Sequence, residues 1–146
     1  MFTMKPNEGR LQTAEHILAR TIEHDIPDSR FVISTFQEDS GKIEVYAETD
    51  LRKIDLAKLQ DAVNKVIQRD LQVTKHVLPR EEAEKEYDLA RLSVSVREIR
   101  IVEIEGFDKT PCKDPHVENT SQIGHFEILK VKKTGRNHYR FDFTVK

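Results

Sequence analysis

The order of helical and strand patterns along the chain constrains its fold more than any other feature. Apolar residues recur at helical spacing over residues 10–25 and again over 55–69. Four further runs predict strands joined in pairs by short turns, at residues 31–36, 42–47, 126–131 and 138–145. Because these helices and strands do not alternate regularly, a parallel doubly wound sheet is disfavoured. We expect an α+β fold, with helices packed on a mostly antiparallel sheet.

Shorter elements complete this prediction. A strand over 71–78 ends at a proline, a short helix with acidic residues in its first turn follows over 80–89, and another strand runs over 98–104. In the turn between the first two strands we expect Gly41 to take a positive φ. The longest irregular stretch is 107–124, and long loops in small domains often carry function.

The size of the chain fits one domain over residues 1–146. No apolar run approaches the ~20 residues that span a bilayer, and the N-terminal segment lacks the apolar core of a signal peptide. Cys112 is the only cysteine in the sequence, which excludes an internal disulfide. We therefore expect a cytoplasmic protein with no membrane partner.

The charge of the chain is unevenly distributed. The formal net charge of −2 argues against a dedicated nucleic-acid binder. Residues 107–146, however, carry 8 basic and 5 acidic side chains, so their net charge is positive. The positive charge can steer a partner with a few phosphates to that segment. The same charge pattern also fits a hairpin whose side chains are simply solvated.

Two separated motifs hold the residue types that carry chemistry. Gln12 and His16 lie four residues apart in the first predicted helix and so project from one face. Cys112 and His116 have the same spacing in the long loop, where a thiolate and an imidazole can hold one metal ion together with a helix histidine. Each motif alone also fits a packed cysteine or ordinary hydrogen-bonded histidines.

These motifs resemble those of a known family. The segment LQTAEHILAR resembles the H-T-A-x-H-L-L helix of the alanyl-tRNA synthetase editing domain, and TPCKDPHVENTSQIGHFEILKVKK resembles its C-x-x-x-H-V-x-x-T-x-x-I-G-x-F block. HVLPREEAEKEYDL and VREIRIVEIEGFD match the region between them. The matching segments occur in the same order over nearly the whole chain. The chain therefore resembles the short form of AlaX, the free-standing editing proteins.

The resemblance implies an alanyl/threonyl-tRNA synthetase editing-domain-like fold and a trans-acting hydrolase. Its substrate would be mischarged tRNA(Ala), chiefly seryl-tRNA(Ala) and in some members glycyl-tRNA(Ala). The protein would bind the acceptor end of this tRNA. Two alternatives stay open. One is an editing hydrolase of other specificity, such as for seryl-tRNA(Thr), and the other is an RNA- or partner-binding module that has lost catalysis.

The resemblance also implies a zinc site. Carried over residue by residue, His16, Cys112 and His116 are ligands, and the first helix ligand of the family falls on Gln12. This is a departure, because an amide oxygen is a weaker zinc ligand than an imidazole. The site then either binds zinc through three residues with Gln12 or water in the fourth position, or works without metal, as the related bacterial threonyl-tRNA synthetase editing domain does.

The remaining expectations concern catalysis and binding. His16, His116 and Thr13 are the catalytic candidates, the two histidines as general bases if they are free of metal. Polar groups that could pair with the serine hydroxyl are found at Thr13, Ser34 and Thr35. Lys113 and the C-terminal hairpin are the expected RNA contacts. Thr120 is expected to shape its loop by hydrogen bonds to backbone groups.

Overall fold

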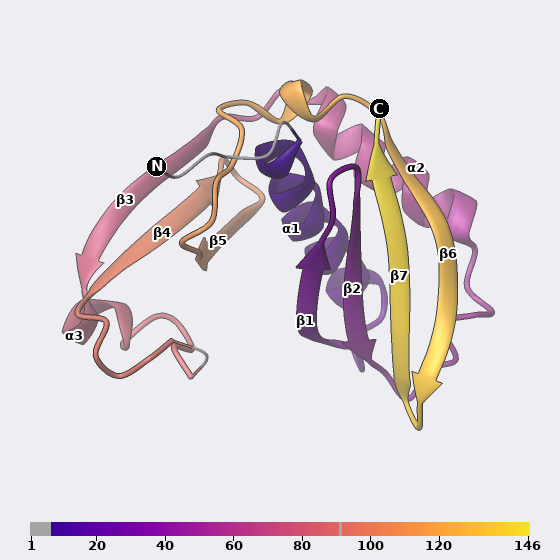
Figure 1. Ribbon diagram of the computed structural model, residues 1–146, viewed down its shortest axis with the longest axis horizontal. Coiled ribbons are helices and arrows are strands. Elements are labelled where there is room, and N and C mark those ends of the chain that lie inside the picture. Colours follow the sequence, from indigo (N-terminus) through magenta and orange to yellow (C-terminus); the bar gives the residue numbers. More distant parts are fainter. Residues whose placement is uncertain (1–6, 91) are drawn as a thin grey trace.

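The computed structural model describes residues 7–90 and 92–146, which form two antiparallel sheets with the first helix between them (Figure 1). The elements in chain order are α1 (Glu8–Asp25), β1 (Arg30–Phe36), β2 (Ser40–Tyr46), α2 (Leu56–Gln68), β3 (Val73–Pro79), α3 (Arg80–Ala83), β4 (Glu98–Ile104), β5 (Asp108–Pro111), the 3-10 turn η1 (Thr120–Ile123), β6 (Phe126–Gly135) and β7 (His138–Val145). This arrangement confirms the predicted α+β fold. No described helix is both long and apolar enough to cross a membrane.

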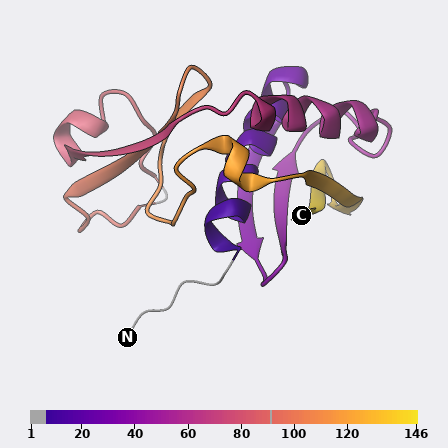
Figure 2. The ribbon, with the colours of Figure 1, turned by 90° about the horizontal axis from the view of Figure 1, so that it is seen from above.

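The larger sheet has four strands in the order β1-β2-β7-β6, and α1 and α2 cover one of its faces (Figure 2). Ile43 and Val45 of β2 lie beside Phe141 and Phe143 of β7 on that face, and all four are at most 1% exposed. Every second residue of these strands therefore points into the core, as the alternating sequence pattern predicts. Burial of each such side chain contributes about 1.5–3 kcal/mol.

The smaller sheet, β3-β4-β5, extends beside α1 and shares the main core through Val73, Val102 and Ile104. A second cluster forms at its far end around Ile99 and Ile101. Because the main core includes side chains from both sheets, the position of β5 relative to α1 is fixed by packing.

The long helices and the predicted strands are confirmed, but the predictions for residues 80–89 and 107–124 are wrong. The helix expected over 80–89 ends at Ala83 and continues as turns. A longer helix would align like charges such as Glu82 and Glu86 one turn apart, which opposes its extension. The stretch 107–124 is also more ordered than expected, because β5 pairs with β4 and η1 follows.

Thr120 hydrogen-bonds backbone groups, as predicted, and these groups belong to residues outside its own loop. Its Oγ1 accepts a hydrogen bond from the backbone N–H of Leu71 at 2.8 Å and donates to the carbonyl of Ile67 at 3.1 Å. These bonds join η1 to the end of α2 and satisfy backbone groups that the helix leaves unpaired.

Gly41 is needed for a different reason from the predicted one. The positive-φ residues of the described chain do not include it, and it lies inside β2 opposite Phe143. A Cβ atom at this position would lie 2.5 Å from Cζ of the Phe143 ring, which is fully buried. The glycine therefore makes room for an aromatic side chain in the core.

We predict that Gly41→Ala destabilises the fold by about 1–3 kcal/mol, because the buried ring cannot move aside without strain. Urea unfolding followed by circular dichroism measures the change. Gly135→Ala is the matched control, since the nearest atom to its added Cβ is His138 Cβ at 3.8 Å, and its stability should stay within about 0.5 kcal/mol of wild type. Equal stability of the two variants would contradict the packing argument.

Candidate functional site

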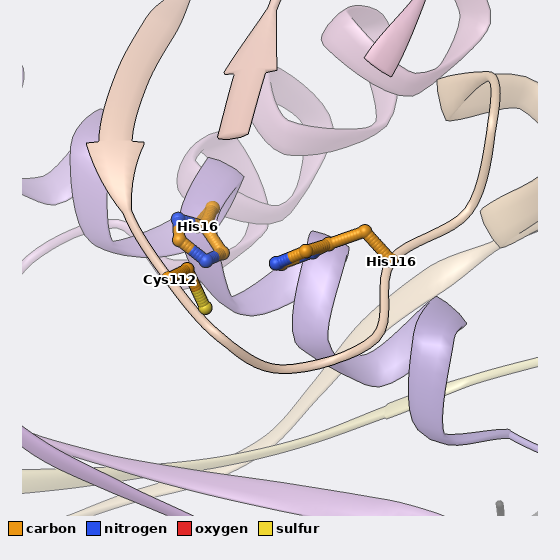
Figure 3. A group of neighbouring side chains, drawn as sticks. All are labelled: His16, Cys112 and His116. Atoms are coloured by element: carbon orange, nitrogen blue, oxygen red, sulfur yellow. The ribbon is translucent and has the colours of Figure 1, made fainter. Parts of the chain in front are cut away.

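Three side chains from the two predicted motifs meet between α1 and the loop after β5. The ligand atoms of His16, Cys112 and His116 all lie within 4.8 Å of one another (Figure 3). The two imidazole rings meet edge to face, with centroids 4.8 Å apart and an angle of 67° between their planes. We call these residues the His-Cys-His group. The structure thus brings together the residues that the spacing selected.

The loop that carries Cys112 and His116 is held from both sides. On one side, the loop is bonded to Arg100 of β4. The Cys112 N–H donates to the Arg100 carbonyl at 3.0 Å, and the Arg100 guanidinium donates to the carbonyls of Cys112 and Asp114. On the other side, the first turn of α1 packs on the loop. A Cβ at Gly9 would lie 3.3 Å from the carbonyl carbon of His116. The loop is therefore positioned by β4 and α1 together.

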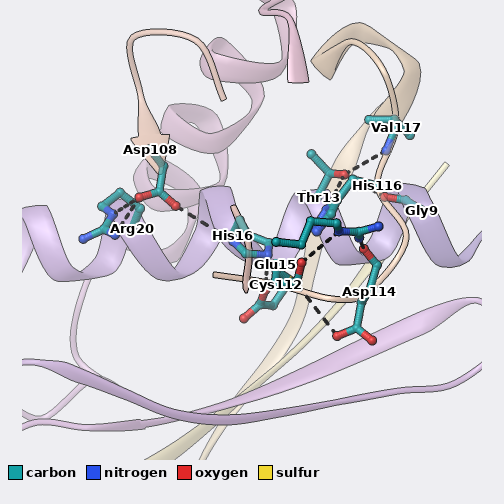
Figure 4. Close-up of polar contacts among 11 residues, drawn as sticks. Gly9, Thr13, Glu15, His16, Arg20, Asp108, Cys112, Asp114, His116 and Val117 are labelled. Carbon is teal, nitrogen blue, oxygen red and sulfur yellow. Dashed lines mark hydrogen bonds and ion pairs between the residues drawn. The ribbon is translucent and has the colours of Figure 1, made fainter. Parts of the chain in front are cut away.

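Thr13 fixes the orientation of His116 (Figure 4). Its hydroxyl donates to the carbonyl of Gly9 at 2.8 Å, accepts from the N–H of Val117 at 3.1 Å, and lies 3.2 Å from Nδ1 of His116. Because the hydroxyl proton is directed at Gly9, Nδ1 of His116 carries the ring proton and Nε2 has a free lone pair. That Nε2 is buried and has no hydrogen-bond partner among the described residues.

The environment keeps His116 neutral. Burial, followed by the positive charge of His16, lowers the pKa of His116 to about 3. A neutral ring with its unpaired nitrogen directed into the His-Cys-His group is the form that ligates a metal.

His16 is surrounded by acidic groups instead. Its Nδ1 lies 3.9 Å from Oδ2 of Asp108, and its Nε2 lies 3.7 Å from Oε2 of Glu15. Arg20 holds Asp108 in place by donating to Oδ1 at 2.6 and 2.9 Å. Burial alone lowers the pKa of His16, but the contacts with Asp108, Cys112 and Glu15 outweigh it and raise the pKa to about 10. Without a metal, His16 is therefore a cation at neutral pH.

Asp108 is ionised, because two cationic side chains lie beside it. Burial raises the pKa of this carboxyl, but His16 and Arg20 together lower it below the ordinary value. Arg20, Asp108 and His16 thus form a row of alternating charge that ends at the His-Cys-His group.

These residues fit a zinc ion. Imidazole nitrogens and a thiolate sulfur are donors that zinc takes, and a set of three protein ligands would leave a fourth position for water or substrate, as in catalytic zinc sites. The orphaned Nε2 of His116 is a ligand atom without a protein partner, and each ring has a neighbour on its Nδ1 side, Thr13 or Asp108, as metal-bound histidines do. The ion would replace the proton of His16 in the same field of carboxylates.

A cavity of about 570 Å³ opens beside the group, between α1, β1 and β5. This lies within the usual size range of ligand sites. Among the predicted residues, Gln12, His16, Ser34 and Cys112 line it. Gln12 is buried one helical turn before His16, where the resemblance placed the first ligand.

The other predicted residues are placed differently. Thr35 lines a neighbouring hollow, together with Gln12, Ser34 and Asp114. Thr13 is fully buried beneath His116 and is not among the residues that line either space. Lys113 is exposed on the loop. Thr13 can therefore act on a substrate only through His116.

Sequence reasoning missed four residues of the site. Glu15 and Asp114 line the cavity, and the Cys112 thiol donates to Oδ2 of Asp114 at 3.8 Å. Both acidic residues are within two positions of a predicted ligand, which is a usable signal. Asp108 and Arg100 have no such signal, because their contacts depend on the pairing of β5 with β4.

Comparison with known proteins gives consistent matches. The family model "Threonyl and Alanyl tRNA synthetase second additional domain" matches residues 99–142, which include Cys112 and His116. Alanyl-tRNA editing protein AlaX-L of Pyrococcus horikoshii is 33% identical over 92% of this chain and 33% of its own length. AlaX-M of Methanosarcina barkeri is 29% identical over 93% of the chain and 57% of its own length.

The alanine–tRNA ligase of Pyrobaculum calidifontis is 32% identical over 89% of the chain and 14% of its own length. The chain thus spans between 14% and 57% of the length of these relatives. The family resemblance expected from the sequence is confirmed by these matches.

We predict that Thr13→Val weakens zinc binding about 10- to 100-fold, because His116 loses the hydrogen bond that fixes its ring. Titration of the metal-free protein with zinc against a chromophoric chelator measures the affinity. Thr21→Val is the matched control, since Thr21 donates to the carbonyl four residues earlier in the same helix but lies outside the group. An unchanged affinity in Thr13→Val would contradict the orienting role.

We also predict that Asp108→Asn lowers the pKa of His16 in the metal-free protein, because the contact with Asp108 is the strongest one that raises it. A lost opposite charge at this distance corresponds to a fall of about 1 to 3 in the pKa. An NMR titration of the ring protons measures the change. Asp25→Asn, which removes an exposed carboxylate beside His24, should leave the pKa of His16 unchanged. A pKa that stays near 10 in Asp108→Asn would refute the assignment.

Proposed function

We propose that this chain, a relative of the alanyl-tRNA editing proteins, hydrolyses the ester bond of misacylated tRNA(Ala), with serine as the main amino acid removed and glycine as a second one. The observation that carries the proposal is the His-Cys-His group, two of whose members, His16 and Cys112, line a cavity of ligand size. The names of the relatives support the choice of substrate. The proposal treats residues 1–146 as one editing domain, since one core joins the two sheets.

Zinc is the proposed cofactor, held by His16, Cys112 and His116 with Gln12 or water beside them. When bound, a zinc ion polarises an ester carbonyl or lowers the pKa of a water molecule. Thr13 and Asp108 orient the two rings for this task, and Arg100 keeps the loop in place.

Ester hydrolysis requires a proton acceptor for the attacking water. Water adds to the carbonyl carbon, the bond to the ribose oxygen breaks, and that oxygen takes up a proton. A protonated His16 has no lone pair to accept the proton, so in a metal-free site it would stabilise the oxyanion instead. His116 does not line the cavity, and burial lowers its pKa to about 3, so it is a poor base for that water. The carboxylates of Glu15 and Asp114, which line the cavity, are then the available bases.

Selectivity for serine requires a polar group that pairs with the extra hydroxyl. Ser34 lines the cavity near Gln12, and Thr35 follows it on β1 and lines the neighbouring hollow. A polar group left unpaired by alanine penalises binding of that amino acid, whereas an apolar wall discriminates poorly. We assign the serine contact to Ser34 and a phosphate contact to Lys113, which is exposed on the loop next to Cys112.

The proposal predicts rapid deacylation of seryl-tRNA(Ala), slower deacylation of glycyl-tRNA(Ala) and no loss of alanine from alanyl-tRNA(Ala). Release of radiolabelled amino acid measures each rate, with zinc content determined on the same sample. Cys112→Ala should lower the rate about 100-fold or more, since it removes both a ligand and the group that Asp114 contacts.

Ser34→Ala serves as the comparison, because it should reduce the preference for serine over alanine while the zinc content stays the same. A folded, zinc-loaded protein that spares all three substrates would refute this assignment. Hydrolysis of seryl-tRNA(Thr) alone would move the specificity to that tRNA.

A further inference from the structure

The outer face of the four-stranded sheet, turned away from α1 and α2, carries a row of stacked side chains. The Arg30 guanidinium lies 4.9 Å from the centroid of the Tyr46 ring. The same ring meets His138 edge to face, with centroids 5.6 Å apart. The strand register places these three residues side by side on β1, β2 and β7, so they form one continuous row across the sheet.

Strand alternation settles which way this row faces. Ile43 and Val45 of β2 are buried under the helices, so Lys42 and Tyr46 point to the opposite side. In Figure 1, α1 and α2 lie behind the sheet and no described element crosses in front of it. The row is therefore open to a partner.

The charge of this face is mainly positive. Besides Arg30, it carries the basic side chains of Lys42, Arg140, Lys130 and Lys132, which adjoin in the strand register. Three carboxylates share the face, Glu44, Asp142 and Glu127, and Glu127 is paired with Lys146 at 2.8 Å. Asp142 is paired with Arg140 at 2.9 Å and Lys130 at 3.7 Å, and Glu44 lies opposite Arg140. Lys42 and Lys132 form no ion pair with any residue in the described ranges.

The outer face continues into the cavity across the edge strand β1. Arg30 and Ile33 point to the outer face, and both also line the cavity beside His16 and Cys112. A chain that lies along the stacked row and crosses β1 at Arg30 thus arrives at the His-Cys-His group.

We infer that the outer face binds the single-stranded acceptor end of a tRNA and directs its terminal nucleotide over β1 into the cavity. Single-stranded RNA binds by stacking of its bases on aromatic rings and guanidinium planes, and by neutralisation of its phosphates. The stacked row supplies the first kind of contact, and Lys42 and Lys132 supply the second. This inference rests on the proposed function for the identity of the RNA.

The test compares Lys42→Gln/Lys132→Gln and Tyr46→Leu with wild type in binding of uncharged tRNA(Ala), measured by fluorescence anisotropy over a range of salt concentrations. Loss of two phosphate contacts should reduce the slope of log affinity against log salt by about 1.5. Loss of the aromatic ring should weaken binding about 10-fold with little change in that slope.

Lys58→Gln/Lys65→Gln is the matched control, because it removes two lysines from α2 on the opposite side of the sheet. This pair should leave both affinity and salt slope unchanged. Wild-type binding in the Lys42/Lys132 variant, equal losses in the α2 control, or no tRNA binding by wild type would each overturn the inference.

A second substrate separates this inference from the proposed function. Seryl-adenosine carries the ester but no acceptor strand, so its hydrolysis depends on the cavity alone. We expect the Lys42/Lys132 variant to hydrolyse it as wild type does, while its KM for seryl-tRNA(Ala) rises. If wild type binds tRNA through the outer face but hydrolyses neither ester, the inference holds and the proposed function fails.

Discussion

The contact between the first turns of α1 and the loop after Cys112 is the constraint on which the site depends. Thr13 satisfies its own hydroxyl on Gly9 and uses both of its acceptor positions for the loop, one for the Val117 N–H and one for His116. Since a buried hydroxyl and a buried N–H are costly to leave unpaired, this network admits one loop position and one histidine tautomer. Arg100 holds the far side of the same loop.

The electrostatics of the site follow from this packing. The two histidines lie in ring contact, yet one is held protonated by carboxylates and the other is held neutral by burial and by the first. Asp108 and Glu15 supply negative charge beside the group, and Arg20 limits the excess. Such a field stabilises one positive charge among the three ligand atoms. In the metal-free site, the proton on His16 provides this positive charge. A divalent cation would interact with the same carboxylates more strongly, so one arrangement of charges suits both the metal-free and the metal-bound site.

β1 connects the chemistry to the outer face of the sheet. Residues of this strand border the cavity, and one of them, Arg30, also belongs to the stacked row. Gln12 lies on the opposite wall, at the position where the resemblance placed the first helix ligand, so an amide lines the cavity there. An amide can donate and accept at once, and it therefore gives that wall the capacity to bind a polar substrate group.

The sequence by itself determined the elements that depend on local periodicity, namely the helices over 10–25 and 55–69, the paired strands, and the common face of Gln12 and His16. The motif spacing also selected Cys112 and His116. Only the tertiary structure decided the length of α3, the packing role of Gly41 and the contacts of Asp108 and Arg100. These features depend on partners distant in the sequence, such as Phe143 opposite Gly41 or β4 beside β5, and a local pattern carries no information about which distant residue will fill a neighbouring position.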